Sequence, residues 1–463
     1  MSVRLDRRAV DPMERYQLAV ALRPREMAPL LQGCWPELAR SSRAGTACKI
    51  LDAKYEPGAR CTILYELGRR LVMGHLAWPC PPPVTDTGRA VHSVGMVAYL
   101  FPDDPFLPGL GTAMDDNAMK RVVGEVLPAC REGQVRVLRC RVTALRYRPG
   151  RRCTVRAEVS LRATGSRAIA SVVLFAKLYH DRDKAAAVFE DSAAVSRSES
   201  LRSEGVVVAT PIGFVPKLAM VLNESVAGAP LQAWLAGASY GNKDESRVRQ
   251  GLIGAARGVA SLHSSAVESN RHRPPARVAV ERMARRSARV AMVDAGLGRR
   301  MERLAAALLD LLEGFAQSSS EVTFVHGDCK PSQFLIDGRD IAMLDFDHCG
   351  MADPASDVGS FTASIRQQRV RAALAGAKGA ATPPAPLVLE KLFVDEYCDR
   401  RKADVDFRRR VRWYEASALL RKAYRAFQRS PRSALCPALV DEGWLSLQSL
   451  SSGRLERVGA STR

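Results

Sequence analysis

Short apolar segments separated by polar turns fill the chain up to Asp181, a pattern typical of β-strands. Residues 49–55 and 63–67 flank one Pro-Gly turn, and residues 135–147 and 155–161 flank another. In such a turn proline presets φ at the first corner, and glycine accepts the positive φ at the next. The pattern therefore predicts two β-hairpins, one around each turn.

The two turns also share a sequence. Residues 55–63 read YEPGARCTI and residues 147–155 read YRPGRRCTV. A weaker similarity links residues 97–103 (VAYLFPD) to residues 175–181 (FAKLYHD), in which Lys177 stands opposite Tyr99. Two interpretations stay open at this point. Either a β-rich unit was duplicated and only the second copy kept the lysine, or two similar hairpins arose independently.

Beyond Asp181 the chain becomes rich in alanine and leucine at helical spacing. This spacing predicts helices at residues 183–196, 247–264, 275–295 and 298–315. A β-rich insert at residues 322–346 interrupts them, and most of the remainder is helical again. The succession of strands and then helices predicts an α+β protein.

The composition is that of a soluble globular protein of more than one domain. The chain has 463 residues, of which 47% are hydrophobic and 25% are charged, close to globular averages. No apolar stretch approaches the roughly 18 to 20 residues that a membrane span needs, and the charged start does not resemble a signal peptide. We therefore expect a cytoplasmic protein without membrane contact.

The net charge of +20 suggests nucleic-acid binding as a hypothesis. The arginines are scattered, however, and aromatic residues make up only 6% of the chain, whereas a nucleic-acid site gathers cations and aromatics on one element. The densest basic stretch, residues 271–303, mixes arginines with apolar residues as a solvated helical face does. We expect no specific nucleic-acid partner. The 11 cysteines show no metal-ligand spacing, so we expect reduced thiols.

The β-rich insert carries the strongest chemical signal. Residues 324–336 read FVHGDCKPSQFLI, and residues 341–347 read IAMLDFD. Each apolar strand has a carboxylate at its edge, Asp328 at one and Asp345 at the other, 17 residues apart. Phosphoryl transfer uses one carboxylate to orient the attacking hydroxyl and another to hold Mg²⁺ against the phosphates. A separation of one hairpin lets both carboxylates reach one cleft.

These motifs resemble those of the aminoglycoside phosphotransferase and choline kinase family, which is related to the protein kinases. The H-G-D sequence at residues 326–328 matches the start of the catalytic loop, and D-P-A-S-D at residues 353–357 matches the motif that follows it. The resemblance implies a bilobal protein-kinase-like fold. It also implies Asp328 as catalytic base, Asp345 as principal Mg²⁺ ligand and Lys330 as the cation that neutralises the transferred phosphoryl group.

One position departs from the family. Gln333 stands where the family has its metal-binding asparagine. Glutamine keeps the amide oxygen and adds one methylene group, so the backbone must retreat by roughly 1.5 Å for the same contact. Maltokinase-like members look similar in using glutamine there, which favours a working site. A dead site, and with it a non-catalytic nucleotide-binding scaffold, stays open as the alternative.

The resemblance extends upstream of the insert. Lys177 matches the lysine that pairs with the α- and β-phosphates of ATP, and the alternative is a surface lysine at a strand end. The family has a glutamate on the next helix that orients this lysine. Glu190 is the candidate, with Glu199 as the alternative. Residues 219–224 resemble the hinge strand that would contact adenine.

The second hairpin turn takes the place of a glycine-rich phosphate loop, because no G-x-G-x-x-G precedes Lys177. Gly150, Arg151 and Arg152 could cover a triphosphate with backbone amides and two guanidinium groups. An ordinary basic turn is the open alternative. We expect His326 to support the loop, Asp357 to cap the next helix and brace the loop, and Asp347 to be a second metal contact or a solvated residue.

The strand and helix pattern, together with the resemblance, predicts four parts of the chain. They are a β-rich cap at 1–125, which is a candidate degenerate repeat of the next part, an amino-terminal lobe at 126–225 with the basic hairpin and Lys177, a helical carboxy-terminal lobe at 226–450 with the catalytic loop, and a flexible tail at 451–463. No oligomeric state is predicted.

The function that follows is that of an ATP- and Mg²⁺-dependent kinase for a hydroxyl group of a small molecule, of the sugar or aminoglycoside-like type. A non-catalytic scaffold is the first alternative. A protein kinase is the second, and two features of the chain disfavour it. Gly327 replaces the arginine of the protein-kinase loop, and no A-P-E stretch follows at the expected distance.

Overall fold

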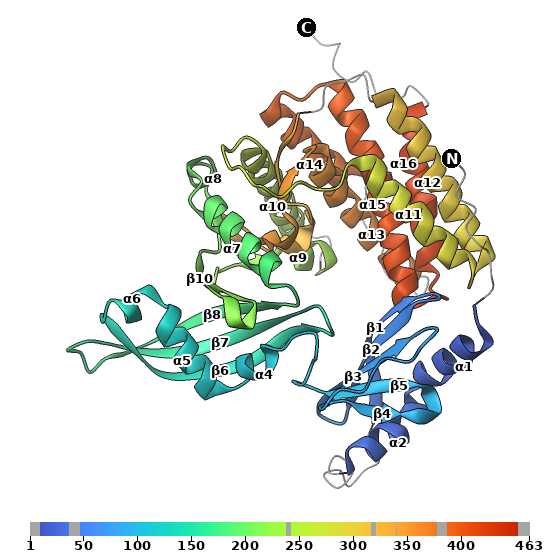
Figure 1. The fold of residues 1–463 in the computed structure, drawn as a ribbon. Helices are drawn as coiled ribbons and strands as arrows, with labels where there is room; N and C mark the ends of the chain where they lie inside the picture. Colours follow the sequence, from blue (N-terminus) through green and yellow to red (C-terminus); the bar gives the residue numbers. More distant parts are fainter. Residues whose placement is uncertain are drawn as a thin grey trace.

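The computed structural model describes residues 10–36, 47–237, 242–315, 321–338, 340–376 and 387–451. Two antiparallel sheets come first along the chain, and a mostly helical part follows them (Figure 1). The predicted α+β class is therefore confirmed. The predicted tail, residues 451–463, lies outside the described residues apart from Ser451.

The cap consists of two helices and a five-stranded sheet. Its elements are α1 (Pro12–Ala21), α2 (Pro24–Cys34), β1 (Cys48–Glu56), β2 (Arg60–Leu67), β3 (Arg70–Ala77), β4 (Arg89–Val91), the 3-10 turn η1 (His92–Val94) and β5 (Met96–Leu100). The strand order is β1-β2-β3-β5-β4. The first predicted hairpin is the β1–β2 pair, in which Tyr55 lies opposite Cys61.

The amino-terminal lobe contains the second five-stranded sheet. Its elements are α4 (Leu110–Ala113), α5 (Asp116–Val126), α6 (Pro128–Arg131), β6 (Val135–Arg148), β7 (Arg152–Ala163), β8 (Ile169–Tyr179), α7 (Arg182–Ser196), α8 (Glu199–Ser203), β10 (Pro211–Val215), η2 (Pro216–Leu218) and β11 (Met220–Glu224). The short strand β9 (Val206–Val208) lies in the same stretch of chain but pairs in parallel with a strand of the carboxy-terminal lobe, β15 (Asp340–Met343). The second predicted hairpin is the β6–β7 pair, in which Tyr147 lies opposite Cys153.

The two sheets have the same topology. Read from the first hairpin strand, the amino-terminal lobe is ordered β6-β7-β8-β11-β10, which repeats the order β1-β2-β3-β5-β4 of the cap. In each sheet a 3-10 turn joins the last two strands, and a residue with left-handed backbone follows it. That residue is Gly95 (φ 63°) in the cap and Ala219 (φ 46°) in the lobe. The shared order favours duplication over two unrelated hairpins.

A shared polar clamp strengthens this correspondence. In the cap, the hydroxyl of Tyr55 and the amide of Gly58 donate to the buried carboxylate of Glu14, at 2.7 and 3.0 Å. In the lobe, the equivalent tyrosine hydroxyl and glycine amide donate to the buried carboxylate of Asp104, at 2.8 and 2.7 Å. Each hairpin turn is thus held by one carboxylate that approaches from outside the hairpin.

The strand order corrects one detail of the sequence comparison. Tyr99, matched to Lys177 by sequence, lies on β5, the counterpart of β11 rather than of β8. The counterpart of Lys177 is His75 on β3, because Thr154 pairs with Lys177 and the equivalent Thr62 pairs with His75. The alignment failed because similar apolar strands do not reveal which neighbour each will pair with.

The carboxy-terminal lobe is mostly helical. Its elements are β12 (Ala229–Pro230), α9 (Leu231–Gly237), α10 (Asn242–His263), α11 (Ala276–Ala291), α12 (Ala295–Phe315), β13 (Thr323–Val325), η3 (Pro331–Gln333), β14 (Phe334–Asp337), β15 (Asp340–Met343), η4 (Phe346–His348), β16 (Gly350–Ala352), α13 (Ala355–Gly376), α14 (Leu387–Arg401), α15 (Val405–Arg429) and α16 (Leu435–Ser451). The four helices predicted from periodicity are found as α7, α10, α11 and α12. Strands β13 to β15 lie within the predicted insert at residues 322–346.

The cap contacts both lobes. Tyr55 stacks on Phe427 of α15 with ring centroids 6.4 Å apart, and the core of the cap continues into α11, α12, α15 and α16. Figure 1 shows the β1–β2 hairpin against the ends of these helices. Toward the other lobe, Phe101 packs on Tyr147 at 5.0 Å, and Leu64 of β2 belongs to the core of the second sheet.

The segment between the two sheets packs with the amino-terminal lobe. Leu110, Met119 and Val123 are buried in the core of the second sheet, together with Val137 of β6. The sequence-based boundary at residue 125 assigns this segment to the cap. Helices α4 and α5 therefore correspond in position to α1 and α2, since each pair precedes its own sheet along the chain.

We predict that Asp104→Ala loosens the second hairpin turn. The substitution leaves the buried hydroxyl of Tyr147 and the amide of Gly150 without their acceptor, which costs on the order of 1–3 kcal/mol of folding free energy. Urea denaturation of the purified chain measures this loss. Asp103→Ala is the matched control, because its side chain is exposed, and it should stay within about 0.5 kcal/mol of the parent. Equal stability of both variants would contradict the clamp.

Candidate active site

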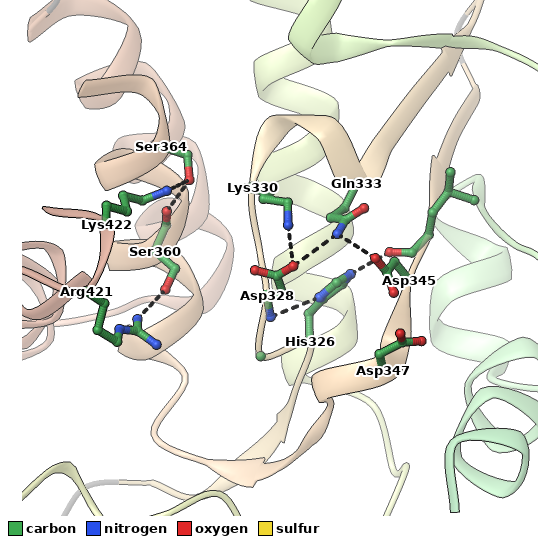
Figure 2. A network of polar contacts seen from close by, with 12 residues as sticks. His326, Asp328, Lys330, Gln333, Asp345, Asp347, Ser360, Ser364, Arg421 and Lys422 are labelled. Atoms are coloured by element: carbon green, nitrogen blue, oxygen red, sulfur yellow. Dashed lines mark hydrogen bonds and ion pairs between the residues drawn. The ribbon is translucent and has the colours of Figure 1, made fainter. Parts of the chain in front are cut away.

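The loop between β13 and β14 brings the predicted catalytic residues together. The side-chain amide nitrogen Nε2 of Gln333 lies 3.3 Å from a carboxylate oxygen of Asp328 and 3.1 Å from one of Asp345 (Figure 2). Lys330 pairs directly with Asp328. The side chains of Asp328 and Asp345 are 20% and 16% exposed, so solvent reaches both. The two carboxylates of the sequence motif thus share one accessible site.

A buried carboxylate from α13 fixes the start of this loop. Asp357 accepts the backbone amide protons of His326 at 2.6 Å and Gly327 at 2.8 Å. Its side chain also lies 3.2 Å from Nε2 of His263, whose other ring nitrogen contacts the hydroxyl of Tyr397 at 2.8 Å. Burial would raise the pKa of Asp357, but the hydrogen bond and charge of His263 and the amide of Gly327 hold it below its usual range. The expected bracing role of Asp357 is found in the structure.

The ring of His326 ties the loop to the strand that carries Asp345. The amide of Asp328 donates to Nδ1 of His326 at 3.3 Å, and Nε2 lies 2.8 Å from the carbonyl oxygen of Leu344. An acceptor at Nδ1 and a donor at Nε2 describe one neutral tautomer of the imidazole. The ring also packs on Phe346 at a centroid distance of 4.9 Å. His326 therefore supports the loop, as expected.

Two cations of the amino-terminal lobe meet the carboxylates that follow β15. The ammonium group of Lys177 lies 2.8 Å from Asp345 and 3.0 Å from Asp347. Arg152 pairs closely with Asp347 and lies 3.5 Å from Asp345, and the hydroxyl of Tyr179 donates to Asp347 at 2.8 Å. Burial would raise the pKa of Asp345, but the charges of Lys177 and Arg152 hold it well below its usual range.

The catalytic candidate Asp328 is ionised throughout the physiological range. Burial would raise its pKa, but Lys330 and then Arg425 outweigh burial and lower it to about 2. An ionised carboxylate can accept a hydrogen bond from a hydroxyl group and align its oxygen for attack. Arg425 lies on α15, which sequence reasoning did not connect with the site.

Of the three residues predicted to bind phosphate at the second hairpin turn, Arg152 contacts the carboxylates of the site. Gly150 (φ 67°) directs its amide to Asp104, away from the site, so it shapes the turn. Arg151 is exposed as a whole residue. Partial desolvation of its guanidinium group, together with the charge of Arg425, lowers its pKa despite the opposing charge of Glu56.

The structure does not bring Glu190 to Lys177. Glu190 is exposed on α7, whereas Asp191 beside it is buried and accepts from Nε of Arg271 at 2.6 Å. Across the described ranges, the carboxylates paired with Lys177 are Asp345 and Asp347. The prediction was wrong because sequence periodicity located the helix without fixing which of its faces points toward β8.

Sequence reasoning missed Tyr179 and left Asp347 undecided. Asp347 is 2% exposed and receives contacts from Lys177, Arg152 and Tyr179, so it is not a solvated residue. The available signal was the alternation along β8, since Lys177 and Tyr179 are two residues apart and point to the same face of the strand.

The profile of a phosphotransferase enzyme family (APH) matches residues 157–390. The chain belongs to this family. The predicted protein-kinase-like fold with an extra amino-terminal β-rich cap is confirmed, and the protein is a phosphotransferase of small molecules. A search of curated proteins finds no match. No helix within the described ranges is long and apolar enough to cross a membrane.

The phosphotransferase is also similar to solved structures. A choline/ethanolamine kinase family protein from Mesorhizobium loti is 15% identical, with a TM-score of 0.42, over 73% of this chain and 95% of that one. Choline kinase LicA from Streptococcus pneumoniae is 13% identical, with a TM-score of 0.43, over 72% and 98%. A choline kinase from Cryptosporidium parvum is 11% identical, with a TM-score of 0.48, over 72% and 96%.

We predict that Gly327→Ala disables the catalytic loop. Gly327 has φ 76°, and a Cβ atom there would collide with the carbonyl oxygen of His348. The loop must therefore shift away from Asp357, and we expect both the melting temperature and the rate of phosphoryl transfer to fall, the latter at least about tenfold. Gly111→Ala is the control, since nothing lies within 4 Å of an added Cβ and its φ is ordinary. Full turnover by Gly327→Ala would show that the loop tolerates a side chain.

Proposed function

We propose that the phosphotransferase transfers the γ-phosphoryl group of ATP, with Mg²⁺, to a hydroxyl group of a small molecule of the sugar type. The observation that carries this proposal is the position of Gln333. Its amide contacts Asp328 and Asp345 at 3.3 and 3.1 Å, which places the hydroxyl-activating carboxylate next to the metal-binding one. Phosphoryl transfer requires this neighbourhood.

The nucleotide side of the site is supplied by the amino-terminal lobe. Lys177 and Arg152 converge on Asp345 and Asp347, with contacts of 2.8 to 3.5 Å in addition to the close Arg152–Asp347 pair. Ammonium and guanidinium groups at this position can donate to phosphate oxygens. Burial lowers the pKa of Lys177, but Asp347 and Asp345 outweigh it and raise the pKa, so the lysine keeps its charge.

The residues present fit a magnesium ion. Asp345 and Gln333 offer a carboxylate and an amide oxygen, once the amide is rotated so that its oxygen faces the ion, and Asp347 adds a second carboxylate. Mg²⁺ is commonly held by one or two carboxylates together with substrate phosphates and water. Bound there, Mg²⁺ would neutralise part of the charge of the phosphates.

The acceptor hydroxyl group is positioned by Asp328. The ionised carboxylate accepts the hydrogen bond of the hydroxyl group and aligns its oxygen with the γ-phosphorus. It receives the hydroxyl proton as the new P–O bond forms and the bond from the γ-phosphorus to the leaving ADP oxygen breaks. Lys330, which is paired with Asp328, lies where its ammonium group can balance charge on the transferred oxygens. His326 and Asp357 hold this loop in place before the substrate binds.

We predict that Asp328→Asn and Asp345→Asn each lower kcat by a factor on the order of 100 or more, because each removes a charge needed in the transition state. Phosphoryl transfer from labelled ATP to a panel of hydroxylated metabolites, followed by mass spectrometry, measures this. Asp337→Asn is the matched control, because Asp337 is exposed at the end of β14. Turnover at the parent rate by either active-site variant would refute the assignment.

The same assay separates the alternatives. Thermal stabilisation by Mg²⁺ and ATP without turnover on any compound would favour a nucleotide-binding scaffold. Label on protein substrates but on no small molecule would favour a protein kinase.

A further inference from the structure

Asp328 has a second neighbourhood that the proposed transfer of phosphate does not use. Figure 2 shows the acidic pair on one side of Asp328 and the helices α13 and α15 on the other. The nucleotide side is occupied by the cations of the amino-terminal lobe, as described above. The groups on the far side of the catalytic carboxylate therefore face the acceptor, provided that the proposed function holds.

Cations of α15 dominate this acceptor side. Arg421, Lys422, Arg425 and Arg429 follow one another at helical spacing near the end of the helix, and we call them the α15 cation cluster. Residues at i, i+4 and i+8 share one face of a helix. A run of like charges on one face repels itself unless something of opposite charge faces it.

Among the residues that the structure describes, the hydrogen-bond partners of the first two members are all neutral. Nη2 of Arg421 donates to the hydroxyl oxygen of Ser360 at 3.3 Å. The ammonium group of Lys422 donates to the hydroxyl oxygen of Ser364 at 2.9 Å and to the side-chain oxygen of Gln367 at 3.2 Å. Nε of Arg421 is buried and has no hydrogen-bond partner. All three neutral partners lie on α13.

Cations in the first half of α15, unlike the first three members of the cluster, are paired with carboxylates. Arg408 pairs with Asp395 at 2.7 Å, and Arg410 pairs with Asp353 at 3.1 Å. In the described part of the chain, by contrast, no carboxylate lies within ion-pair distance of the first three cluster members. Asp328 in the catalytic loop acts on Arg421 and Lys422 through its charge, from a longer distance. Arg429 has one exposed partner, Asp52, at 3.4 Å.

The electrostatic consequence is measurable at individual groups. Burial, followed by the charge of Arg425, lowers the pKa of Lys422 to about 7, while Asp328 acts in the opposite direction. Burial, followed by Arg425 and Arg273, lowers the pKa of Arg421 to about 10. The folded protein therefore holds these cations in a desolvated site beside other cations, and both conditions disfavour their charged forms.

A cation from the other lobe faces the same space. Arg148, at the end of β6, lies within the electrostatic reach of Asp328 and Arg429. Burial, followed by Arg152, Arg146 and Arg429, lowers its pKa to about 10. Cations thus approach the catalytic carboxylate from two lobes, and an acceptor that carried positive charge would be repelled by both.

We propose that the phosphoryl acceptor is an anionic hydroxyl compound, a hydroxy acid or a phosphate monoester, whose anionic group is bound by Arg421, Lys422 and Arg425. The unpaired cations and the unpartnered Nε of Arg421 supply charge-assisted donors for carboxylate or phosphate oxygens. The hydroxyl group of the same molecule then reaches Asp328. This inference names the acceptor class of the proposed function and disfavours polycationic acceptors of the aminoglycoside type.

Binding can be tested independently of catalysis. The full chain, saturated with Mg²⁺ and ADP to fill the nucleotide side, is titrated with two matched sets: glucose, glucosamine, gluconate and glucose 6-phosphate, and glycerol, glycerate and glycerol 3-phosphate. We expect at least one anion to raise the melting temperature saturably, with its neutral parent and glucosamine tenfold or more weaker. Equal responses to the neutral compounds, a stronger response to glucosamine, or no response to any anion would overturn the proposal.

Lys422→Gln tests the assigned residues. We expect the apparent affinity for the active anion to fall by a factor on the order of 10 to 100, while the affinity for ADP is unchanged. Lys422→Arg should restore binding, and Lys391→Gln, an exposed substitution on α14, should leave it at the parent value. An anion response that persists in Lys422→Gln would place the anion elsewhere.

The same variant has a second readout. Because the pKa of Lys422 is lower in the folded chain than in the unfolded one, the native state binds fewer protons, and stability rises with pH from about 7 to 10.5. The penalty of burying the charged ammonium group beside Arg425 is greatest below pH 7, so Lys422→Gln should raise the melting temperature at pH 6 by about 2–4 °C. A lower melting temperature of Lys422→Gln at pH 6 would show that the charged lysine does not destabilise the fold.

The inference and the proposed function can fail separately. If the chain binds the anion but its activity does not depend on Asp328, the result counts against the proposed function alone.

Discussion

The attraction between two carboxylates and two cations joins the lobes of the phosphotransferase across its site. Asp345 and Asp347 follow one strand of the carboxy-terminal lobe, and Lys177 and Arg152 extend from the sheet of the other lobe. Buried ion pairs are stable only where further hydrogen bonds satisfy them, and the hydroxyl of Tyr179 supplies one. The left-handed backbone of Asp345 (φ 68°) turns its side chain into this group. The relative placement of the two lobes at the site depends on it.

The catalytic loop could be predicted from the sequence because its chemistry is local. The H-G-D motif, the strand before Asp345 and the brace at Asp357 fall within about thirty residues, and the resemblance of this short segment to the family predicted that they lie together. The face of a helix could not be predicted in the same way. Consecutive residues on an α-helix point about 100° apart, so an assignment one position from Asp191 put Glu190 in the wrong direction.

Pairing between distant segments was the other limit of prediction. The repeat was visible in two hairpin turns, but only the strand order shows that the position equivalent to Lys177 in the cap is His75 and not Tyr99. Arg421 and Lys422 were equally visible as basic residues, and nothing in their own segment shows that α13 faces them with neutral side chains. Basic residues that look alike in the sequence can therefore lie either on the solvated surface or beside a candidate site.

The cap has a mechanical consequence. It is anchored at one end in the helices through Tyr55 and Phe427, and at the other end beside Tyr147 through Phe101. A domain that packs against both lobes limits how far the lobes can move apart. Any change in the angle between the lobes must therefore displace one of these two aromatic contacts. The cap sheet, which lacks the lysine, thereby restricts the position of the sheet that carries it.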